Sequence, residues 1–491
     1  MKFLRTLGVL SFATAAPFAW SQTEGAAFNL TGSGAATTFA TDYQCIGINP
    51  SNLGWAGQFE LKKITFGVAE VGYSIYSDAF TKDALRSDFV KPLLGAEADK
   101  FTFAEKQQAA KNFTNTALAM NGDVRAVGFS IATAKAGGFA FHIADRYQWF
   151  STFNQASAEI LFLGRMAPYF QNLELSDGSI IANDPNLPAN VRDQVVRGFN
   201  LPGQGERISR IYKDGVISQS WVREYALSWG YPMGTTGVVE WFGGVGARYL
   251  TGLAYSMVRS DGSDWEAFTA LSPGFDIDYG EAGKKNPSTV TGDSYSPVGT
   301  GFSGDIGFST LIAKVAKVGI SYTNIGSITW DGNVYEAKDD TLYSLDSPGF
   351  NTYNIFNEAE LIQAENGVFN WTGLKEQKMS TPSQLRTGAS FAIKQVAEVG
   401  LDVIIPTNDA AGNYEKAVMA AGGQWFAAPW LVLSAGVVNG GNMATRLPLG
   451  VTFRSPSGSW EGGVHTRDSI TLVSQNNPHL SAVLGFLRFR V

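Results

Sequence analysis

The last hundred residues of the chain alternate between apolar and polar side chains with a period of two. In residues 386–394 every second side chain is apolar or small, and Arg386 and Lys394 share the opposite face. The same alternation recurs in three later segments: 398–405, 446–454 and 483–491. In the last of these, the alternation assigns Val483, Leu487, Phe489 and Val491 to the apolar face, opposite Arg488 and Arg490. A period of two indicates β-strands with one apolar and one polar face. Such strands are compatible with a soluble antiparallel sheet and with a barrel.

Four further features favour a barrel that crosses a membrane. The chain has a secretory leader, segments of about ten residues, aromatic side chains at segment ends, and alternation along most of its length. These are properties of transmembrane β-barrels. We therefore predict an all-β membrane protein, a single antiparallel transmembrane β-barrel of about 14 strands with an N-terminal plug and helical inserts. The predicted wall strands are centred near residues 71, 128, 142, 225, 246, 307, 322, 390, 401, 420, 433, 450, 463 and 486.

The composition excludes several other classes. The mean hydropathy of −0.04 argues against a helical membrane protein but agrees with a barrel, in which the apolar and polar faces balance. The net charge of −7 and the absence of clustered Lys and Arg argue against a nucleic-acid partner. The single cysteine, Cys45, has no partner for a disulfide.

The N-terminus indicates export. Lys2 and Arg5 precede an apolar run at residues 7–18 that is too short to anchor the chain in a membrane. We interpret residues 1–22 as a signal peptide and predict that the protein lies in the outer membrane of a Gram-negative bacterium. Residues 23–65 are then the plug segment, and residues 66–491 are the barrel. Helical spacing at 83–94, 103–119 and 157–163, with polar stretches elsewhere, predicts inserts near 80–122, 154–217 and 331–380. Asn121-Gly122 predicts a turn, and residues 261–292 are expected to form a loop.

Three short stretches resemble known barrels. The sequence Asn-Pro-Ser-Asn-Leu at residues 49–53 resembles the Asn-Pro-Ala segment of FadL-type fatty-acid transporters. The longer stretch 42–55, together with residues 324–330 and 381–388, also resembles a FadL-like Bacteroidota outer-membrane family of unknown function. The resemblance implies 14 strands and a plug, to which we assign Asn49, Pro50, Asn52, Leu53 and Gly54. It implies no substrate, because the chain lacks a clear match to the ligand-binding residues of the fatty-acid transporters.

Nine titratable residues fall on the polar face of predicted strands. An Arg or Lys at the bilayer midplane costs about 2–4 kcal/mol, so these side chains are expected to face the lumen or a wetted plug. They are His142, Lys317, Arg386, Lys394, Asp402, Arg446, Arg454, Arg488 and Arg490. They could form ion pairs between the barrel and the plug, or they could select a solute.

The catalytic and cofactor motifs are weak. Residues 299–304 match the glycine pattern of dinucleotide-binding proteins, but they lead into a predicted strand where that motif requires a helix. His142 and His465 share the inward face, so a Ser–His lipid hydrolase is conceivable, although solvated lumen histidines are the simpler interpretation. The acidic runs at 261–264 and 276–278 lack full calcium-loop spacing. We predict no enzyme activity, no cofactor and no metal site.

Two functions are consistent with such a barrel. The first is passive uptake of a hydrophobic or amphipathic small molecule, with membrane lipid and a hydrophobic ligand as partners. The second is a non-transport scaffold that docks a surface protein or a secretion-system protein. Inserts that fold into the lumen would favour uptake, and inserts that project outward as an ordered platform would favour docking.

Overall fold

A computed structural model describes residues 27–55, 63–93, 99–133, 135–353, 367–393, 396–414, 416–441 and 443–491. The predicted signal peptide and Lys394 lie outside the described residues. Within this part of the chain, no helix is both long and apolar enough to cross a membrane.

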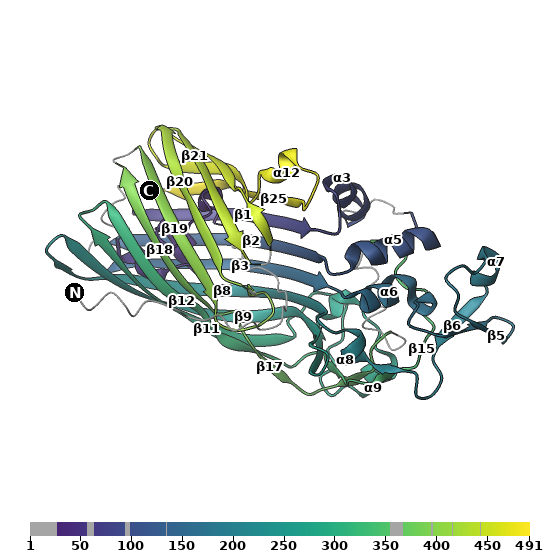
Figure 1. The fold of residues 1–491 in the computed structure, drawn as a ribbon. Helices are drawn as coiled ribbons and strands as arrows, with labels where there is room; N and C mark the ends of the chain where they lie inside the picture. Colours follow the sequence, from purple (N-terminus) through teal and green to yellow (C-terminus); the bar gives the residue numbers. More distant parts are fainter. Residues whose placement is uncertain are drawn as a thin grey trace, which may run out of the picture.

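Fourteen antiparallel strands form a closed barrel, which confirms the predicted fold (Figure 1). They are β1 (Ile64–Ser77), β2 (Ala117–Thr133), β3 (Gly137–Thr152), β8 (Val216–Thr236), β9 (Val239–Ser260), β11 (Gly299–Ile312), β12 (Ala316–Trp330), β18 (Gln384–Ile393), β19 (Ala397–Pro406), β20 (Val418–Ala428), β21 (Leu431–Gly440), β23 (Leu449–Arg454), β24 (Trp460–Thr466) and β25 (His479–Arg490). Each strand pairs with the next in this order, and β25 pairs with β1, so the wall has no free edge. Every predicted strand centre lies within one of these strands.

The outer face of the wall is apolar, in agreement with the alternation in the sequence. Leu401, for example, is 61% exposed and points away from the lumen. The prediction is wrong at Val483, which was assigned to the outer face but is fully buried beside Phe28. The register between β24 and β25 shifts at residues 461–463, and Phe486 and Leu487 are both exposed. This irregularity reverses the alternation for the first half of β25.

The connections differ between the two ends of the barrel. At one end, hereafter the short-turn end, β2–β3, β8–β9, β11–β12, β18–β19 and β20–β21 are joined by a few residues each. At the other end, the insert end, the connections are long, and such asymmetry is typical of bacterial outer-membrane barrels. The turn predicted at Asn121 and Gly122 is wrong, because these residues pair with Ser74 and Tyr73 inside two long strands.

The inserts contain both helices and short strands. They are α3 (Lys82–Ala84), η3 (Leu85–Val90), α4 (Lys91–Leu93), α5 (Phe103–Phe113), α6 (Gln155–Leu163), η4 (Gly164–Met166), β4 (Asn172–Leu175), β5 (Ile180–Ala182), α7 (Ala189–Arg192), β6 (Val195–Phe199), β7 (Glu206–Arg207), α8 (Ile208–Ile211), β10 (Trp265–Leu271), η5 (Pro273–Phe275), α9 (Gly280–Lys285), β13 (Val334–Ala337), β14 (Thr341–Leu342), β15 (Ser344–Leu345), β16 (Trp371–Gly373), β17 (Gln377–Ser380), β22 (Met443–Arg446) and α12 (Ile470–Val473). Helix α5 starts at a capping box formed by Thr102 and Glu105. It ends earlier than predicted because β2 begins at Ala117. Residues 261–292, expected to be a loop, include β10, which extends the sheet from β9.

An aromatic core joins several inserts to the insert end of the wall. It includes Phe80 and Phe113 from the first insert, Phe162 from the second, and Trp149 on the face of β3 opposite to the lumen-lining Gln148. The rings of Phe80 and Phe113 meet edge to face at 5.4 Å. The inserts thus cover this end of the barrel, and a separate four-stranded sheet of β15, β6, β4 and β5 lies beyond it (Figure 1).

We predict that Leu401→Arg impairs insertion, since the charge would meet hydrocarbon at a penalty of about 2–4 kcal/mol near the midplane. The measurement is the fraction of folded, heat-modifiable protein after incorporation into lipid vesicles. The control is Leu201→Arg, which changes an equally apolar, 51% exposed residue of an insert. Equal losses in both variants would contradict the assignment of the outer face.

Candidate functional site

The described N-terminal residues 27–55, hereafter the inner segment, lie inside the barrel (Figure 1). They form α1 (Phe28–Thr31), η1 (Tyr43–Cys45) and η2 (Pro50–Asn52). Side-chain caps set the two short 3₁₀ turns: Asp42 accepts from the backbone of Gln44 at 3.0 Å, and Asn49 accepts from that of Ser51 at 3.2 Å. Pro50 occupies the first position of η2, where its missing N–H is no disadvantage.

Inward-facing glycines make room for this segment. At Gly244 a Cβ atom would overlap the backbone of Pro50 and Ser51, and at Gly422 and Gly436 it would overlap the carbonyl oxygen of Ser33. Other wall glycines at which a side chain would meet the inner segment are Gly67, Gly128, Gly138, Gly230, Gly307, Gly319, Gly388, Gly400 and Gly485. The inner segment therefore packs directly on the wall backbone, through its own backbone at Gly138, Gly230, Gly244, Gly422 and Gly436 and through side chains at the other glycines.

The residues assigned to the plug lie in this contact zone. Asn49 and Pro50 pack against Gly307, and Leu53 packs against Gly138. Gly54 lies against Tyr231 and Phe242. The side chain of Asn52 donates to the carbonyls of Thr37 and Ala40 at 2.8 and 2.9 Å, which ties two parts of the inner segment together.

Charged wall residues hold the inner segment in place. Arg488 pairs with Asp42, and Arg490 lies 3.7 Å from the same carboxylate. One oxygen of Asp402 accepts from the backbone of Ala36 at 2.7 Å, and from the backbone and hydroxyl of Thr37 at 2.8 and 2.9 Å. These contacts are the barrel-to-plug interactions that the sequence left open as one alternative.

Lys317 and Arg454 have acidic partners within the wall. Lys317 lies 2.9 Å from Glu398 and faces the ring of Trp55, while Arg454 lies 3.6 Å from Glu461. Each ion pair therefore links two strands of the wall.

The two inward histidines are buried, in contrast to the solvated lumen histidines expected. His142 lies 2.6 Å from Glu224, and His465 accepts from the backbone of Gly32 at 3.1 Å. Thr452 contacts the other ring nitrogen of His465 at 2.9 Å. The contact with Gly32 makes His465 a support for the inner segment.

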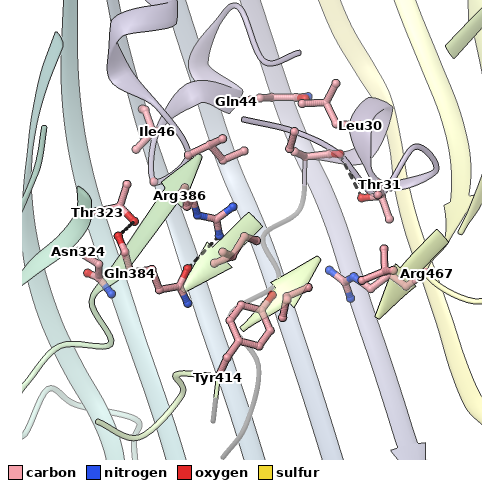
Figure 2. Close-up of a pocket in the computed structure, with 18 of the residues that line it drawn as sticks. Leu30, Thr31, Gln44, Ile46, Thr323, Asn324, Gln384, Arg386, Tyr414 and Arg467 are labelled. Carbon is pink, nitrogen blue, oxygen red and sulfur yellow. Dashed lines mark hydrogen bonds between the residues drawn. The ribbon is translucent and has the colours of Figure 1, made fainter. Parts of the chain in front are cut away.

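A cavity of about 140 Å³ separates the inner segment from part of the wall (Figure 2). Its apolar lining comes from both sides: Leu30, Ile46 and Ile48 of the inner segment, and Ile404, Val418 and Val438 of the wall. Six arginines also line it: Arg125, Arg146, Arg248, Arg386, Arg446 and Arg467. Figure 2 shows Arg386 and Arg467 on opposite sides, with Tyr414 between them. The lining is thus amphipathic and, among the described residues, contains arginine but no carboxylate.

Three of these arginines are paired with acids behind the cavity surface. Arg125 lies 2.6 Å from Glu70, Arg146 lies 3.0 Å from Glu224, and Arg248 lies 2.5 Å from Asp305. These pairs keep the arginines in fixed positions at the cavity wall.

Arg386 differs from these three. Its guanidinium donates to the side chain of Gln384 at 3.0 Å, and it has no ion pair within the part of the chain that the structure describes. A buried guanidinium has five donors, so one bond to an amide leaves it able to bind an anion.

A second cavity of about 50 Å³ lies beside the first and is lined by Leu250, Tyr255 and Trp330, among others. The two cavities share Arg146, Asn324 and Pro382. Their common lining makes them two adjacent compartments of one lumen.

The residues that line both cavities include Asn324 and Pro382, which lie where β12 stops pairing with β18 and begins to pair with β17. Here the hydroxyl of Thr381 donates to the carbonyl of Asn324 at 2.6 Å, and the side chain of Asn324 donates to the carbonyl of Pro382 at 3.1 Å. Two of the stretches noted in the sequence, 324–330 and 381–388, therefore meet at the cavities. The sequence signal for this site is Pro382 between β17 and β18, because proline interrupts strand pairing.

Comparisons with known proteins give similar barrels but no family. No family model matches the chain, and no curated protein does either, so the resemblance to a Bacteroidota family stays a prediction. Similar solved structures include the P. putida toluene transporter TodX (9% identity, 95% of this chain and 98% of that chain, TM-score 0.44) and the Ralstonia pickettii toluene transporter TbuX (10%, 95% and 98%, 0.44). A Pseudomonas aeruginosa FadL homologue is 11% identical over 96% of each chain, with a TM-score of 0.36. Since these scores are below 0.5, the fold rests on the strand pairing, and the function must be argued from this chain.

We predict that Gly244→Ala destabilises the barrel by about 1–3 kcal/mol, because the added methyl displaces Pro50 and Ser51 from a closely packed contact. The measurement is the temperature at which heat-modifiable migration on gels is lost. Gly122→Ala is the matched control, since its methyl would meet only Tyr147 at 3.7 Å. A Gly244→Ala variant as stable as the control would contradict the backbone contact.

Proposed function

We propose that the protein is an outer-membrane barrel that passes a small amphipathic molecule with an anionic end. The closed 14-stranded wall with an apolar outer face supports the membrane location. By the usual asymmetry of such barrels, the insert end faces outward and the short-turn end faces the periplasm.

The observation that carries this proposal is the amphipathic cavity beside the inner segment. An apolar tail would pack against Ile46, Ile404 and Val418, and an anionic group would bind Arg386. A purely apolar ligand would leave the arginine surface unused, so we favour an amphipathic solute over a hydrocarbon.

The route runs from the insert end toward the inner segment. A molecule reaching the smaller cavity, lined by Tyr255 and Trp330, would pass Asn324 and Pro382 into the larger one. The inner segment closes the far side, so we assign it the role of a plug that must shift for release. A carboxylate bound to Arg386 would stay in the larger cavity until the plug moves.

The scaffold function remains an alternative prediction. The four-stranded sheet beyond the barrel is an ordered outward element of the kind that a docking role requires. That role gives no reason for a lumen cavity lined by arginines, whereas passage of an anionic amphiphile does.

We predict that Arg386→Met weakens binding of a fluorescent long-chain carboxylate about 10- to 100-fold, because a hydrogen bond to a charged group contributes about 1.5–3 kcal/mol. Binding is measured by fluorescence titration of the folded barrel. The methyl ester of the same probe should bind both proteins equally. Arg454→Met is the control variant, because Arg454 does not line the cavity. Unchanged carboxylate affinity in Arg386→Met would refute this site.

We also predict that deleting residues 27–54 raises the single-channel conductance in planar bilayers, because this stretch fills the lumen. The deletion also removes Asp42, a partner of the last strand, so heat-modifiable migration must first show that the barrel has closed. Unchanged conductance of a closed barrel would place the barrier elsewhere.

A further inference from the structure

Two apolar side chains project from the connection between β24 and β25. Leu472 and Val473, at the end of α12, are 72% and 88% exposed. They lie at the insert end of the barrel, where the strands leave the wall. Adjacent apolar side chains this exposed to water are unfavourable unless another apolar surface covers them.

The turn that carries them is held by side-chain hydrogen bonds. One oxygen of Asp468 accepts from the backbone of Leu447 and of Ile470, each at 3.1 Å. Its other oxygen accepts from the hydroxyl of Thr471 at 2.8 Å, and that hydroxyl accepts from the backbone of His479 at 2.8 Å. Leu472 and Val473 are therefore presented by a fixed structure.

A second element joins α12 to form one ledge. The backbone of Lys82 donates to the carbonyl of Gln475 at 2.8 Å, and the side chain of Gln475 donates to Asp83 at 3.1 Å. We call residues 81–83 and 468–476 the rim ledge. Figure 1 shows α12 near α3, beside the start of β25.

The rim ledge continues the apolar outer face of the wall. The hydroxyl of Ser469 donates to the carbonyl of Leu447 at 2.8 Å, so α12 sits directly beside that residue. Leu447 and Leu449 are both more than two-fifths exposed, as is Val464 on the adjacent strand β24. Proceeding along this sector toward the insert end, the exposed apolar residues therefore run from the wall to the ledge.

We propose that the rim ledge binds the outer leaflet of the membrane, with Leu472 and Val473 inserted at the boundary between headgroups and acyl chains. Membrane lipid is the occupant because the ledge is continuous with the face that lipid already covers. Apolar side chains at this boundary add to membrane binding in proportion to the area they bury. Two side chains are also far too small for a stable protein interface, which buries about 800 Å² per partner.

This inference rests on the proposed membrane location, and the experiment separates the two. Cys45 is buried and is replaced in a Cys45→Ala background, in which Val473→Cys is labelled with an environment-sensitive fluorophore. The barrel is incorporated into phosphatidylcholine vesicles with and without spin-labelled acyl chains, which quench fluorophores in contact with them. Leu449→Cys on the wall is the positive control, with Leu401→Cys as its substitute, and Leu201→Cys on an insert is the negative control.

We expect the Val473 probe to lose fluorescence in quencher vesicles nearly as strongly as the wall probe, while the Leu201 probe is unaffected. A quenched wall probe with an unquenched Val473 probe would overturn the ledge proposal and leave the membrane location intact. Absence of quenching at the wall positions would overturn both.

Discussion

Direct contact between the backbone of the inner segment and the glycines of the wall is the constraint on which the rest of the structure depends. Ser33, Pro50 and Ser51 approach the wall so closely that a methyl group at Gly422, Gly436 or Gly244 would not fit. This close contact defines the position of the inner segment in the structure, and the cavity lies where the contact is interrupted. The lumen is filled where wall glycines let the inner segment approach, and the cavity lies where wall arginines such as Arg386 take their place.

Charged side chains then fix the parts of the inner segment that close packing on the glycines does not hold. Asp42 with Arg488 and Asp402 with Thr37 couple the inner segment to two distant sectors of the wall. Buried ion pairs contribute little net stability once desolvation is counted, but losing one partner is strongly unfavourable. Such pairs favour one arrangement of the inner segment, and Arg386 lines the cavity without an ion pair among the described residues.

The fold could be predicted from the sequence because alternating apolar and polar residues identify each strand locally, and the repetition of such strands identifies the barrel. The outward position of Leu401 follows from its neighbours alone. Val483 could not be placed in the same way, since an irregularity between β24 and β25 reverses the parity without any marked residue. The inward position of Arg386 was predictable, but the cavity was not, because Leu30 and Ile46 reach it from a segment more than 300 positions away. Glycine within a strand is often a source of curvature, whereas its role at Gly244 is to admit another backbone.

The closure of the barrel and the position of the inner segment also depend on each other. Backbone pairing between β1 and β25 is interrupted between Val68 and Val71, opposite Gly485. Phe28 packs against Gly485 from inside, and the hydroxyl of Tyr43 donates to Glu70 in the same gap. Two aromatic side chains thus fill the lumen side of the seam where the residue pairing is interrupted. The inner segment therefore packs on an irregular part of the seam as well as filling the lumen.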